Sequence, residues 1–244
     1  SDGDDKVSGK AIYAVDVKIA GMIHGKILRS PYAHARLTRV DASKAENFPG
    51  VFAVITRADQ ARLRMFGAAY KDQTIVAVDK VRYAGDPVAA VAAVDEATAE
   101  EALALIDVEY EELPAVTSLE EALAPGASLV HEANVSGGEL MGQHYEAPKE
   151  FSGTNLCYRF SYGKGNVEEG FKKAHQVFEN VFTFPRVQHF SMEPHATVAQ
   201  FEGDRLTLWA ATQEPFTLRE HLADIFQLPL NKIRVIVPYV GGGY

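Results

Sequence analysis

Short apolar runs and alternating apolar and polar positions predict strands through the first hundred residues. Residues 11–30 predict two strands joined by a turn at residues 20–21, and residues 51–55 predict a short buried strand. Residues 73–94 predict further strands, which the Gly-Asp-Pro sequence at 85–87 interrupts with a turn. We therefore expect a sheet in this part of the chain.

The residues that follow have helical periodicity. Asp95 is suited to the N-cap position, and four apolar residues then recur at intervals that place them on one helix face: Ala99, Ala102, Leu103 and Ile106. Residues 108–113 return to a strand pattern. We predict one α+β domain over residues 1–114, in which the polar, acidic residues 1–9 are a flexible lead-in.

Residues 115–155 differ in composition from the preceding domain. They are rich in Gly, Ser, Asn and Pro, and their apolar residues show weak periodicity. So long an irregular stretch is uncommon inside a compact domain. An extended linker that runs over a partner surface explains it more easily, and a disordered loop is the alternative that the composition leaves open.

Regular patterns resume at residue 156 and predict a second, incomplete domain over residues 156–244. Asn166 with Glu169 predicts the start of a helix whose apolar face contains Val167, Phe171, Ala174 and Phe178. Strands of a second sheet are expected at residues 181–190, 196–203 and 205–212, with a hairpin turn at Gly203-Asp204.

The last two predicted elements are a helix and a strand. Thr217 and Glu220 predict a capping box for a helix whose core-facing residues are Leu218, Leu222, Ile225 and Phe226. Residues 232–240 are apolar almost throughout, which predicts a strand buried on both faces. Because a strand–helix–strand crossover places both strand ends at one edge of a sheet, Gln213 and the final glycines are expected at one rim.

Composition and charge narrow the function classes. The chain has 244 residues, 47% of them hydrophobic, and a net charge of −9, so no broad nucleic-acid surface is expected. The lone Cys157 excludes an internal disulfide and is interpreted as structural. No stretch approaches the roughly 18 apolar residues of a membrane span, and a cytoplasmic location is expected.

Two features near the end of the chain suit ligand binding. Residues 241–243 are glycines, which can turn several backbone N–H groups toward one anionic or oxo-rich ligand. Their spacing fits neither a dinucleotide nor a P-loop site. Gln213, between a predicted strand and a predicted helix, can donate from its amide. For each feature alone, the simpler interpretation is a tight turn or a surface polar residue.

Other polar groups carry weaker signals. His189, Glu193 and His195 fall in a segment predicted to be extended, where a four-residue spacing separates side chains by roughly 13 Å, so hydrogen bonding is expected before metal binding. Arg29, His34 and Arg36 are expected on a solvated rim. No GxSxG nucleophile motif is present.

Five stretches, in this order along the chain, together resemble a known family: GKAIYAVDVKIAGMIHGKILRSPYAHARLTRVDASKA, VRYAGDPVAAVAA, QHFSMEPHATVAQF, ATQEPF and VPYVGGGY. They are similar to the large subunit of molybdenum hydroxylases, the family of xanthine dehydrogenase, aldehyde oxidoreductase and carbon monoxide dehydrogenase. The resemblance implies an α+β fold. An α/β-hammerhead domain would be followed by the first part of a molybdopterin-binding α+β domain.

The resemblance also implies cofactor-binding residues. Gln213 resembles the family glutamine whose amide approaches the molybdenum centre. Gly242, Gly243 and Tyr244 resemble the start of the GGGFG loop, with tyrosine in place of the usual phenylalanine. The catalytic glutamate of the family lies in a part that has no counterpart here, so no catalytic residue is assigned, and Glu193 does not match its motif position.

The implied cofactor is molybdopterin with molybdenum, with or without a cytosine nucleotide. Iron–sulfur clusters and FAD are expected in partner subunits or domains. The expected partners are the remaining C-terminal half of the molybdenum subunit, an iron–sulfur subunit and an FAD subunit. The substrate is expected to be an aldehyde or an N-heterocycle, purine-like or nicotinate-like, oxidised with oxygen from water.

The chain alone is expected to be inactive, as a fragment or one partner of a split subunit. A non-catalytic binding or assembly module derived from the same fold is the alternative. The residues that follow Tyr244 in the gene, or a companion chain, distinguish the two. An exposed sheet edge and apolar surface near residues 205–244 are expected to cause self-association of the isolated chain.

Overall fold

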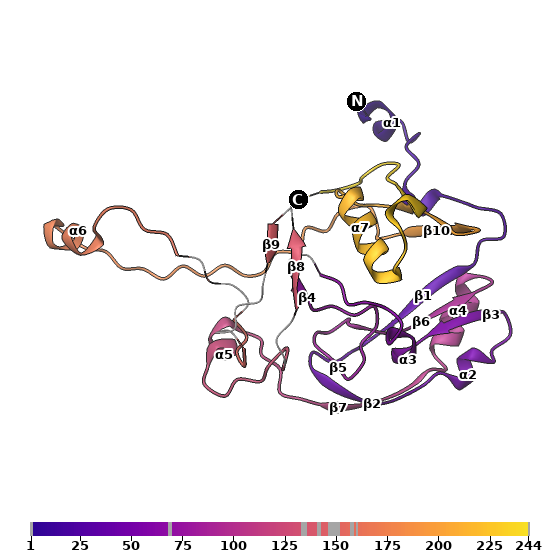
Figure 1. The fold of residues 1–244 in the computed structure, drawn as a ribbon, viewed down its shortest axis with the longest axis horizontal. Helices are drawn as coiled ribbons and strands as arrows, with labels where there is room; N and C mark the ends of the chain where they lie inside the picture. Colours follow the sequence, from indigo (N-terminus) through magenta and orange to yellow (C-terminus); the bar gives the residue numbers. More distant parts are fainter. Residues whose placement is uncertain are drawn as a thin grey trace.

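The computed structural model describes residues 2–67, 70–132, 136–140, 143–145, 152–156, 159 and 161–243. The helices, including the short 3-10 turns η1 and η3, are α1 (Gly3–Val7), η1 (Ala14–Asp16), α2 (Ser43–Glu46), α3 (Arg57–Gln60), α4 (Glu96–Leu103), α5 (Leu119–Leu123), α6 (Val167–Lys173), α7 (Pro215–Phe226) and η3 (Leu230–Lys232). The strands are β1 (His24–Arg29), β2 (Ala35–Asp41), β3 (Val51–Ile55), β4 (Tyr70–Lys71), β5 (Lys80–Val81), β6 (Pro87–Ala93), β7 (Asp107–Glu112), β8 (Ser136–Leu140), β9 (Gln143–Tyr145), β10 (Thr197–Glu202), β11 (Arg205–Ala210) and β12 (Ile233–Ile236). Figure 1 shows their arrangement.

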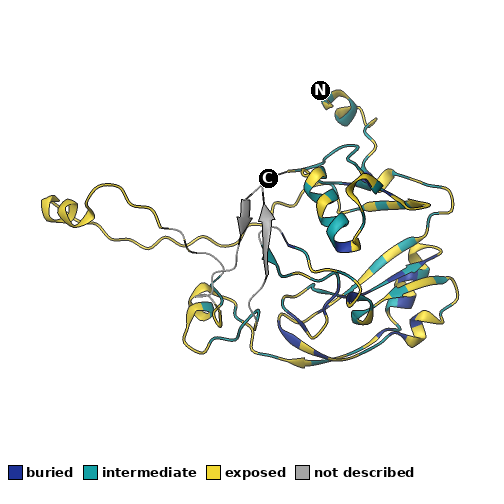
Figure 2. Cartoon of the chain, in the orientation of Figure 1, coloured by how far each residue is buried: buried dark blue, intermediate teal, exposed yellow. Residues whose placement is uncertain are grey.

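Strand β6 is the centre of the first sheet, in which β1 and β3 pair with it antiparallel on either side. Ala89 and Val91 belong to a core that includes Ala99 and Ala102 of α4, while Val88, on the other face of β6, belongs to a second core. Small side chains on both elements let the helix lie close to the sheet. The dark blue segments of Figure 2 mark these buried residues.

Helix α4 confirms the sequence prediction. The side chain of Asp95 accepts a hydrogen bond from the backbone N–H of Thr98 at 2.8 Å, which is N-cap geometry. The strands predicted at residues 51–55 and 108–113 form as β3 and as β7, which runs from Asp107 to Glu112. Antiparallel pairing of β7 and β5 with β2 builds a second sheet.

A polar cluster around the buried Lys80 and His34 connects this second sheet to the segment that follows it. Lys80 is 3% exposed and His34 is 8% exposed. The Lys80 ammonium lies 3.0 Å from Nε2 of His34 and donates to Glu132 Oε1 at 2.5 Å and to the carbonyl of Leu129 at 2.9 Å. Nδ1 of His34 donates to the carbonyl of Pro114 at 2.7 Å. The expectation of a solvated rim is therefore wrong for His34.

The N-terminal residues differ from the sequence prediction in two ways. Residues 3–7 form α1, where a flexible lead-in was expected, and Lys6 donates to the carbonyl of Val240 at 3.0 Å. The first of the two strands predicted in residues 11–30 does not form. The backbone N–H of Tyr13 donates to the Asp16 carboxylate at 2.9 Å instead, which closes η1.

Regular elements also occur within residues 115–155, for which an irregular linker was predicted. Ser118 and Glu121 form a reciprocal capping box that starts α5. Strand β8 pairs with β4 and with β9, although residues 146–151 lie outside the described part. A five-residue helix and short strands contain too few apolar positions for periodicity to reveal them.

The C-terminal sheet has the order β10-β11-β12. Strands β10 and β11 form the predicted hairpin, with Gly203 at φ 63° in its turn. Strand β12 pairs with β11 in parallel, and α7 is the crossover between them and packs against β12; Leu206, Ile225 and Ile233 are buried. The last strand was predicted to be buried on both faces. That is wrong, because β12 is short and lies at an edge of the described sheet.

Helix α7 begins earlier than the sequence predicts. Pro215 occupies the start of the helix, a position that tolerates its missing N–H. The hydroxyl of Thr212 accepts from the backbone N–H of Glu214 at 3.1 Å just before it. Thr217 and Glu220 therefore lie inside the helix and form no capping box. No helix among the described residues is both long and apolar enough to cross a membrane.

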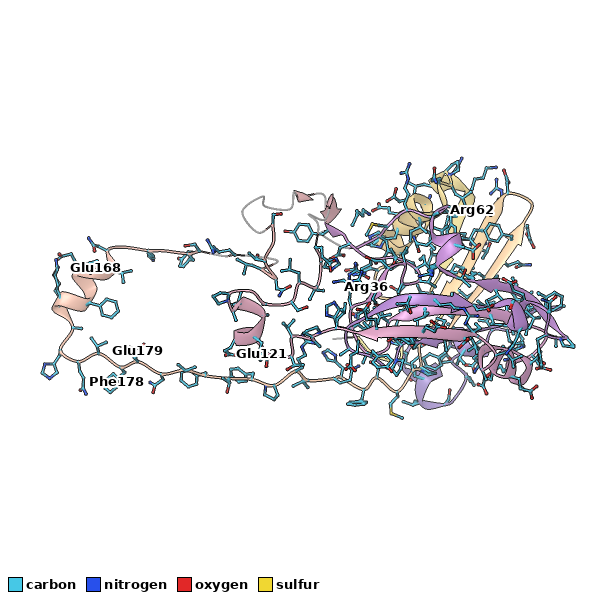
Figure 3. All side chains as sticks on the ribbon, turned by 90° about the horizontal axis from the view of Figure 1, so that it is seen from below. Arg36, Arg62, Glu121, Glu168, Phe178 and Glu179 are labelled. Atoms are coloured by element: carbon cyan, nitrogen blue, oxygen red, sulfur yellow. The ribbon has the colours of Figure 1, made fainter. Side chains whose placement is uncertain are left out.

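Residues 161–187 extend away from the sheets (Figure 1), whereas Gln188, His189 and Ser191 lie beside the residues that follow β11 and β12. The side chain of Asn166 caps α6 as predicted, accepting the N–H of Glu169 at 3.0 Å, but the apolar face of this helix is exposed. The strand predicted at residues 181–190 does not form, because these residues pair with no strand in the described part. Figure 3 shows Phe178 on this segment, far from the body of the protein.

Helix α7, the crossover of the C-terminal sheet, also contacts Arg64 and Lys71 of the N-terminal part. The guanidinium of Arg64 donates to Asp224 Oδ1 at 2.8 Å, and the ammonium of Lys71 lies 3.4 Å from Asp224 Oδ2. The backbone N–H of Arg64 also donates to the carbonyl of Ile225 at 3.4 Å. Side-chain and backbone contacts thus hold Arg64 and Lys71 against the C-terminal end of α7.

Candidate functional site

The ends of β11 and β12 meet where the sequence predicts. Gln213 follows β11, and the glycines at 241–243 follow β12 after a short irregular stretch. A Cβ placed on Gly243 would lie 2.5 Å from both Cδ and Oε1 of Gln213. The predicted meeting of the two strand ends at one rim is confirmed, because the parallel β11–α7–β12 crossover carries both to the same edge.

These strand ends border a cavity of about 260 Å³. Its lining comprises six polar side chains, three apolar residues, two glycines and one carboxylate: Gln188, His189, Ser191, Glu193, Pro194, His195, Ala211, Thr212, Gln213, Val240, Gly242 and Gly243. No lysine or arginine of the described part belongs to this lining. The site is therefore suited to holding polar or oxo-rich groups by hydrogen bonds rather than by ion pairing.

Each glycine of the loop sits against a polar side chain that leaves no room for a Cβ. A Cβ on Gly241 would lie 2.5 Å from Cβ of Glu193, and one on Gly242 would lie 2.6 Å from Oγ of Ser191. Distances under about 3 Å are well inside van der Waals contact. The glycines therefore permit a close approach of the loop backbone to the segment at 191–193 and to Gln213.

Glu193 anchors the first glycine. Its Oε2 atom accepts the backbone N–H of Gly241 at 2.6 Å. Its Oε1 atom is buried and has no hydrogen-bond partner among the described residues. The expected hydrogen bonding is confirmed for Glu193. No group of three or more potential metal ligands occurs in the described residues.

The structure places only some of the residues that the sequence singles out. Gln213, Gly242 and Gly243 line one cavity, while Tyr244 and Cys157 lie outside the described residues. The sequence did not indicate that Glu193 contacts the glycine loop. The only signal for it was its place in a polar segment upstream of the hairpin.

The N-terminal segment also reaches this region, and no local pattern could reveal the contact. The hydroxyl of Tyr239 donates to Asp5 Oδ2 at 2.7 Å, across 234 residues of sequence. The hydrogen bond to Asp5 raises the pKa of the Tyr239 hydroxyl, and desolvation raises it further. The rings of Tyr13 and Tyr239 are tilted, with centroids 5.9 Å apart.

Two family models match the chain. Residues 8–114 match the aldehyde oxidase and xanthine dehydrogenase a/b hammerhead domain. Residues 149–244 match the molybdopterin cofactor-binding domain.

Curated relatives match over nearly the full chain. A probable xanthine dehydrogenase subunit of Bacillus subtilis is 40% identical over 100% of this chain and 30% of its own length. The carbon monoxide dehydrogenase large chain of Afipia carboxidovorans is 36% identical over 97% of this chain and 29% of its own. The nicotinate dehydrogenase large molybdopterin subunit of Eubacterium barkeri is 32% identical over 100% of this chain and 53% of its own. The chain thus spans less than two thirds of each relative.

Solved structures agree with this similarity. Quinoline 2-oxidoreductase from Pseudomonas putida 86 superposes with a TM-score of 0.82 and 34% sequence identity, covering 99% of this chain and 30% of that one. The Cu,Mo-CO dehydrogenase superposes with a TM-score of 0.78 and 32% identity, with the same two coverages. An α+β hammerhead followed by the start of a molybdopterin-binding domain is therefore the fold of this chain.

Proposed function

The chain belongs to the molybdenum hydroxylase family of xanthine dehydrogenase and aldehyde oxidase, and from this we propose that it is part of the molybdenum-binding subunit of such an enzyme. The complete complex would oxidise an aldehyde or an N-heterocyclic substrate, purine-like or nicotinate-like, with oxygen from water. The relatives include subunits named for xanthine, carbon monoxide and nicotinate dehydrogenases, which supports the reaction class rather than one substrate.

The single observation that supports this proposal best is the meeting of Gln213 with the glycine loop around one cavity. The absence of a Cβ at three successive positions lets the loop backbone lie close to Ser191, Glu193 and Gln213. The loop therefore borders the cavity in which a cofactor edge would lie. When bound, molybdopterin with molybdenum supplies two-electron redox chemistry. The Gln213 amide and the N–H groups of Gly242 and Gly243 would hold it; Tyr244 is proposed to continue this loop.

The residues of this chain at the cavity would orient the cofactor by hydrogen bonds. Amide groups do not titrate in the physiological range, so Gln213 and the loop N–H groups can donate without exchanging protons with the reacting atoms. The carboxylate among the cavity-lining residues is Glu193, and one of its oxygens already accepts from Gly241. We therefore assign it no role as general base and propose that the catalytic glutamate comes from the rest of the subunit.

Further parts of the complex follow from the same proposal. Iron–sulfur clusters and FAD, in partner subunits or domains, would carry electrons away from molybdenum. The remainder of the molybdenum subunit would complete the pocket, and the cofactor would carry a cytosine nucleotide or none. We propose a cytoplasmic location, a hammerhead domain over residues 1–114, a linker over 115–155 and an incomplete cofactor domain over 156–244.

Metal analysis of the native complex tests the function. We expect stoichiometric molybdenum in the complex that contains this chain, and no hydroxylase turnover by purified residues 1–244 alone. A complex that is free of molybdenum yet otherwise intact would contradict the proposal and favour a non-catalytic assembly module. Turnover by residues 1–244 alone would contradict the dependence on further parts.

A further inference from the structure

Side chains of the N-terminal segment form hydrogen bonds with the residues immediately before the glycine loop. The Asp5 carboxylate accepts the Tyr239 hydroxyl at 2.7 Å, and the Lys6 ammonium donates to the Val240 carbonyl at 3.0 Å. Asp2 pairs with Lys6 at 2.7 Å and holds its ammonium in place. Two successive loop-entry residues are thus each fixed by a side chain from α1.

The next residue along is fixed from another direction. Gly241 donates its backbone N–H to Glu193 Oε2 at 2.6 Å, a short, charge-assisted hydrogen bond. Electrostatic attraction by Glu193 also contributes, after the stronger hydrogen bond from Lys6 to Asp2, to the raised pKa of Lys6. Glu193 and α1 therefore act on the same short stretch of backbone.

The loop needs such support because the secondary structure ends before it. Strand β12 ends at Ile236, and residues 237–243 belong to no helix or strand. Glycine is conformationally permissive, so a glycine loop without external contacts samples many backbone orientations. Backbone N–H donors are effective only when they are held near their final geometry, and small misplacements of supporting groups are costly.

We propose that Asp5, Lys6 and Glu193 are positioning residues that clamp residues 239–241, and so set the direction of the loop N–H groups at 242–243. The inference rests on the proposed function for the role of the loop. The clamp itself is a property of this chain's own contacts. The three contacts fix three consecutive residues, and each comes from a segment distant in sequence.

Amide hydrogen exchange measures the clamp directly. In the native complex, Tyr239→Phe removes one hydroxyl and Glu193→Ala removes the acceptor of the Gly241 N–H. We expect the peptide that spans residues 237–243 to exchange about tenfold faster in each variant, the change that corresponds to loss of one such hydrogen bond. Tyr162→Phe, which removes a hydroxyl from an exposed tyrosine on the extended segment, is the matched control and should change nothing there.

Unchanged exchange at residues 237–243 in both variants would overturn the clamp. Should Glu193→Ala fail to assemble, Tyr239→Phe decides alone, because it deletes only one oxygen atom. Cofactor content separates this result from the proposed function. If the wild-type complex contains molybdenum and the variant complexes release it about tenfold faster, both proposals are supported. A wild-type complex without molybdenum would overturn the proposed function, and the exchange result would still decide the clamp.

Discussion

Glycine at position 243 lets the amide of Gln213 occupy the space in which a side chain would begin. This pairing of a small residue with a polar one recurs at Gly241 with Glu193 and at Gly242 with Ser191. Each pair brings a backbone segment and a polar side chain into one narrow volume. The geometry of the cavity is thus decided by single atoms, and single substitutions should test it.

Replacing Gly243 with alanine should weaken cofactor retention. The new Cβ would lie 2.5 Å from Cδ of Gln213, so either the amide or the loop has to move away from the cavity. We expect the molybdenum content of the purified complex to fall severalfold. Gly25→Ala is the matched control, since no atom lies within 4 Å of its Cβ position. Equal molybdenum content in both variants would contradict the assignment of this loop.

A truncation of Gln213 should act on the reaction more than on folding. Gln213 is exposed, so Gln213→Ala should leave the melting temperature of the complex unchanged. Loss of one preorganised donor at a reacting centre typically costs roughly 100-fold or more in kcat. Steady-state kinetics of the complex measure this loss, with Gln176→Ala on the exposed segment as control. Full activity of Gln213→Ala would contradict its proposed role.

The buried ammonium of Lys80 should stabilise the first domain. It contacts His34, Leu129 and Glu132, and replacing it with methionine leaves the buried His34 ring and the half-buried Leu129 carbonyl without this donor. We expect Lys80→Met to lower the free energy of unfolding by about 1–3 kcal/mol. Urea denaturation measures the change, with Lys44→Met at an exposed position as the control. Equal midpoints would show that the cluster contributes nothing.

At the scale of elements, the sequence predicts best where an amphipathic pattern coincides with a cap. Helix α4 has both, and it was predicted with the correct cap and core residues. Helix α7 was predicted with the wrong start, because a Thr/Glu spacing inside the helix imitates a capping box. The strand pattern at residues 181–190 found no neighbour among the described residues, and pairing depends on distant parts of the chain.

The cap of α4 can be tested by itself. Asp95→Ala removes the acceptor of the Thr98 N–H and should lower the midpoint of unfolding. Asp95→Asn keeps an acceptor oxygen in the same place and should lower it much less. Thermal or urea unfolding of both variants measures the difference. Equal losses would mean that the charge of Asp95, rather than its cap hydrogen bond, stabilises the helix N-terminus.

The whole molecule depends on contacts that no local pattern predicts. The fold class and the meeting of Gln213 with the glycines follow from element order and the handedness of the crossover. The contacts of α1 with residues 239–240 join positions 234 residues apart, and the sequence carries no local trace of them. The same holds for Asp224, which connects α7 to residues 64 and 71.

The contacts of Asp224 with Arg64 and Lys71 should make the stability of the protein depend on pH in the acid range. The hydrogen bond from Arg64 has the largest effect on the pKa of Asp224 and lowers it; desolvation opposes this, and attraction to Lys71 lowers the pKa further. A lowered folded-state pKa contributes stability that is present above the unfolded value of about 3.9 and is lost as the pH falls through the folded value. Asp224→Asn should therefore be destabilising at neutral pH and lose that effect below about pH 4. Melting temperatures across this range measure it, with Glu101→Gln as control.

The extended segment decides how the isolated chain behaves. The sequence predicted exposed apolar surface near residues 205–244, whereas large exposed side chains are densest farther upstream, with Val181 89%, Phe184 87% and Met192 93% exposed. Figure 2 shows this segment exposed along its length. Apolar residues occur at both odd and even positions of this segment, a pattern typical of a strand that is covered on both faces. Copies of the chain in which the segment is uncovered should therefore bind one another.

We expect the mass of residues 1–244 in light scattering to rise with concentration, and Phe182→Ser with Phe184→Ser to suppress that rise. Leu119→Ser, at an exposed leucine of α5, should leave the rise unchanged, and a wild-type chain that stays monomeric at high concentration would contradict the prediction.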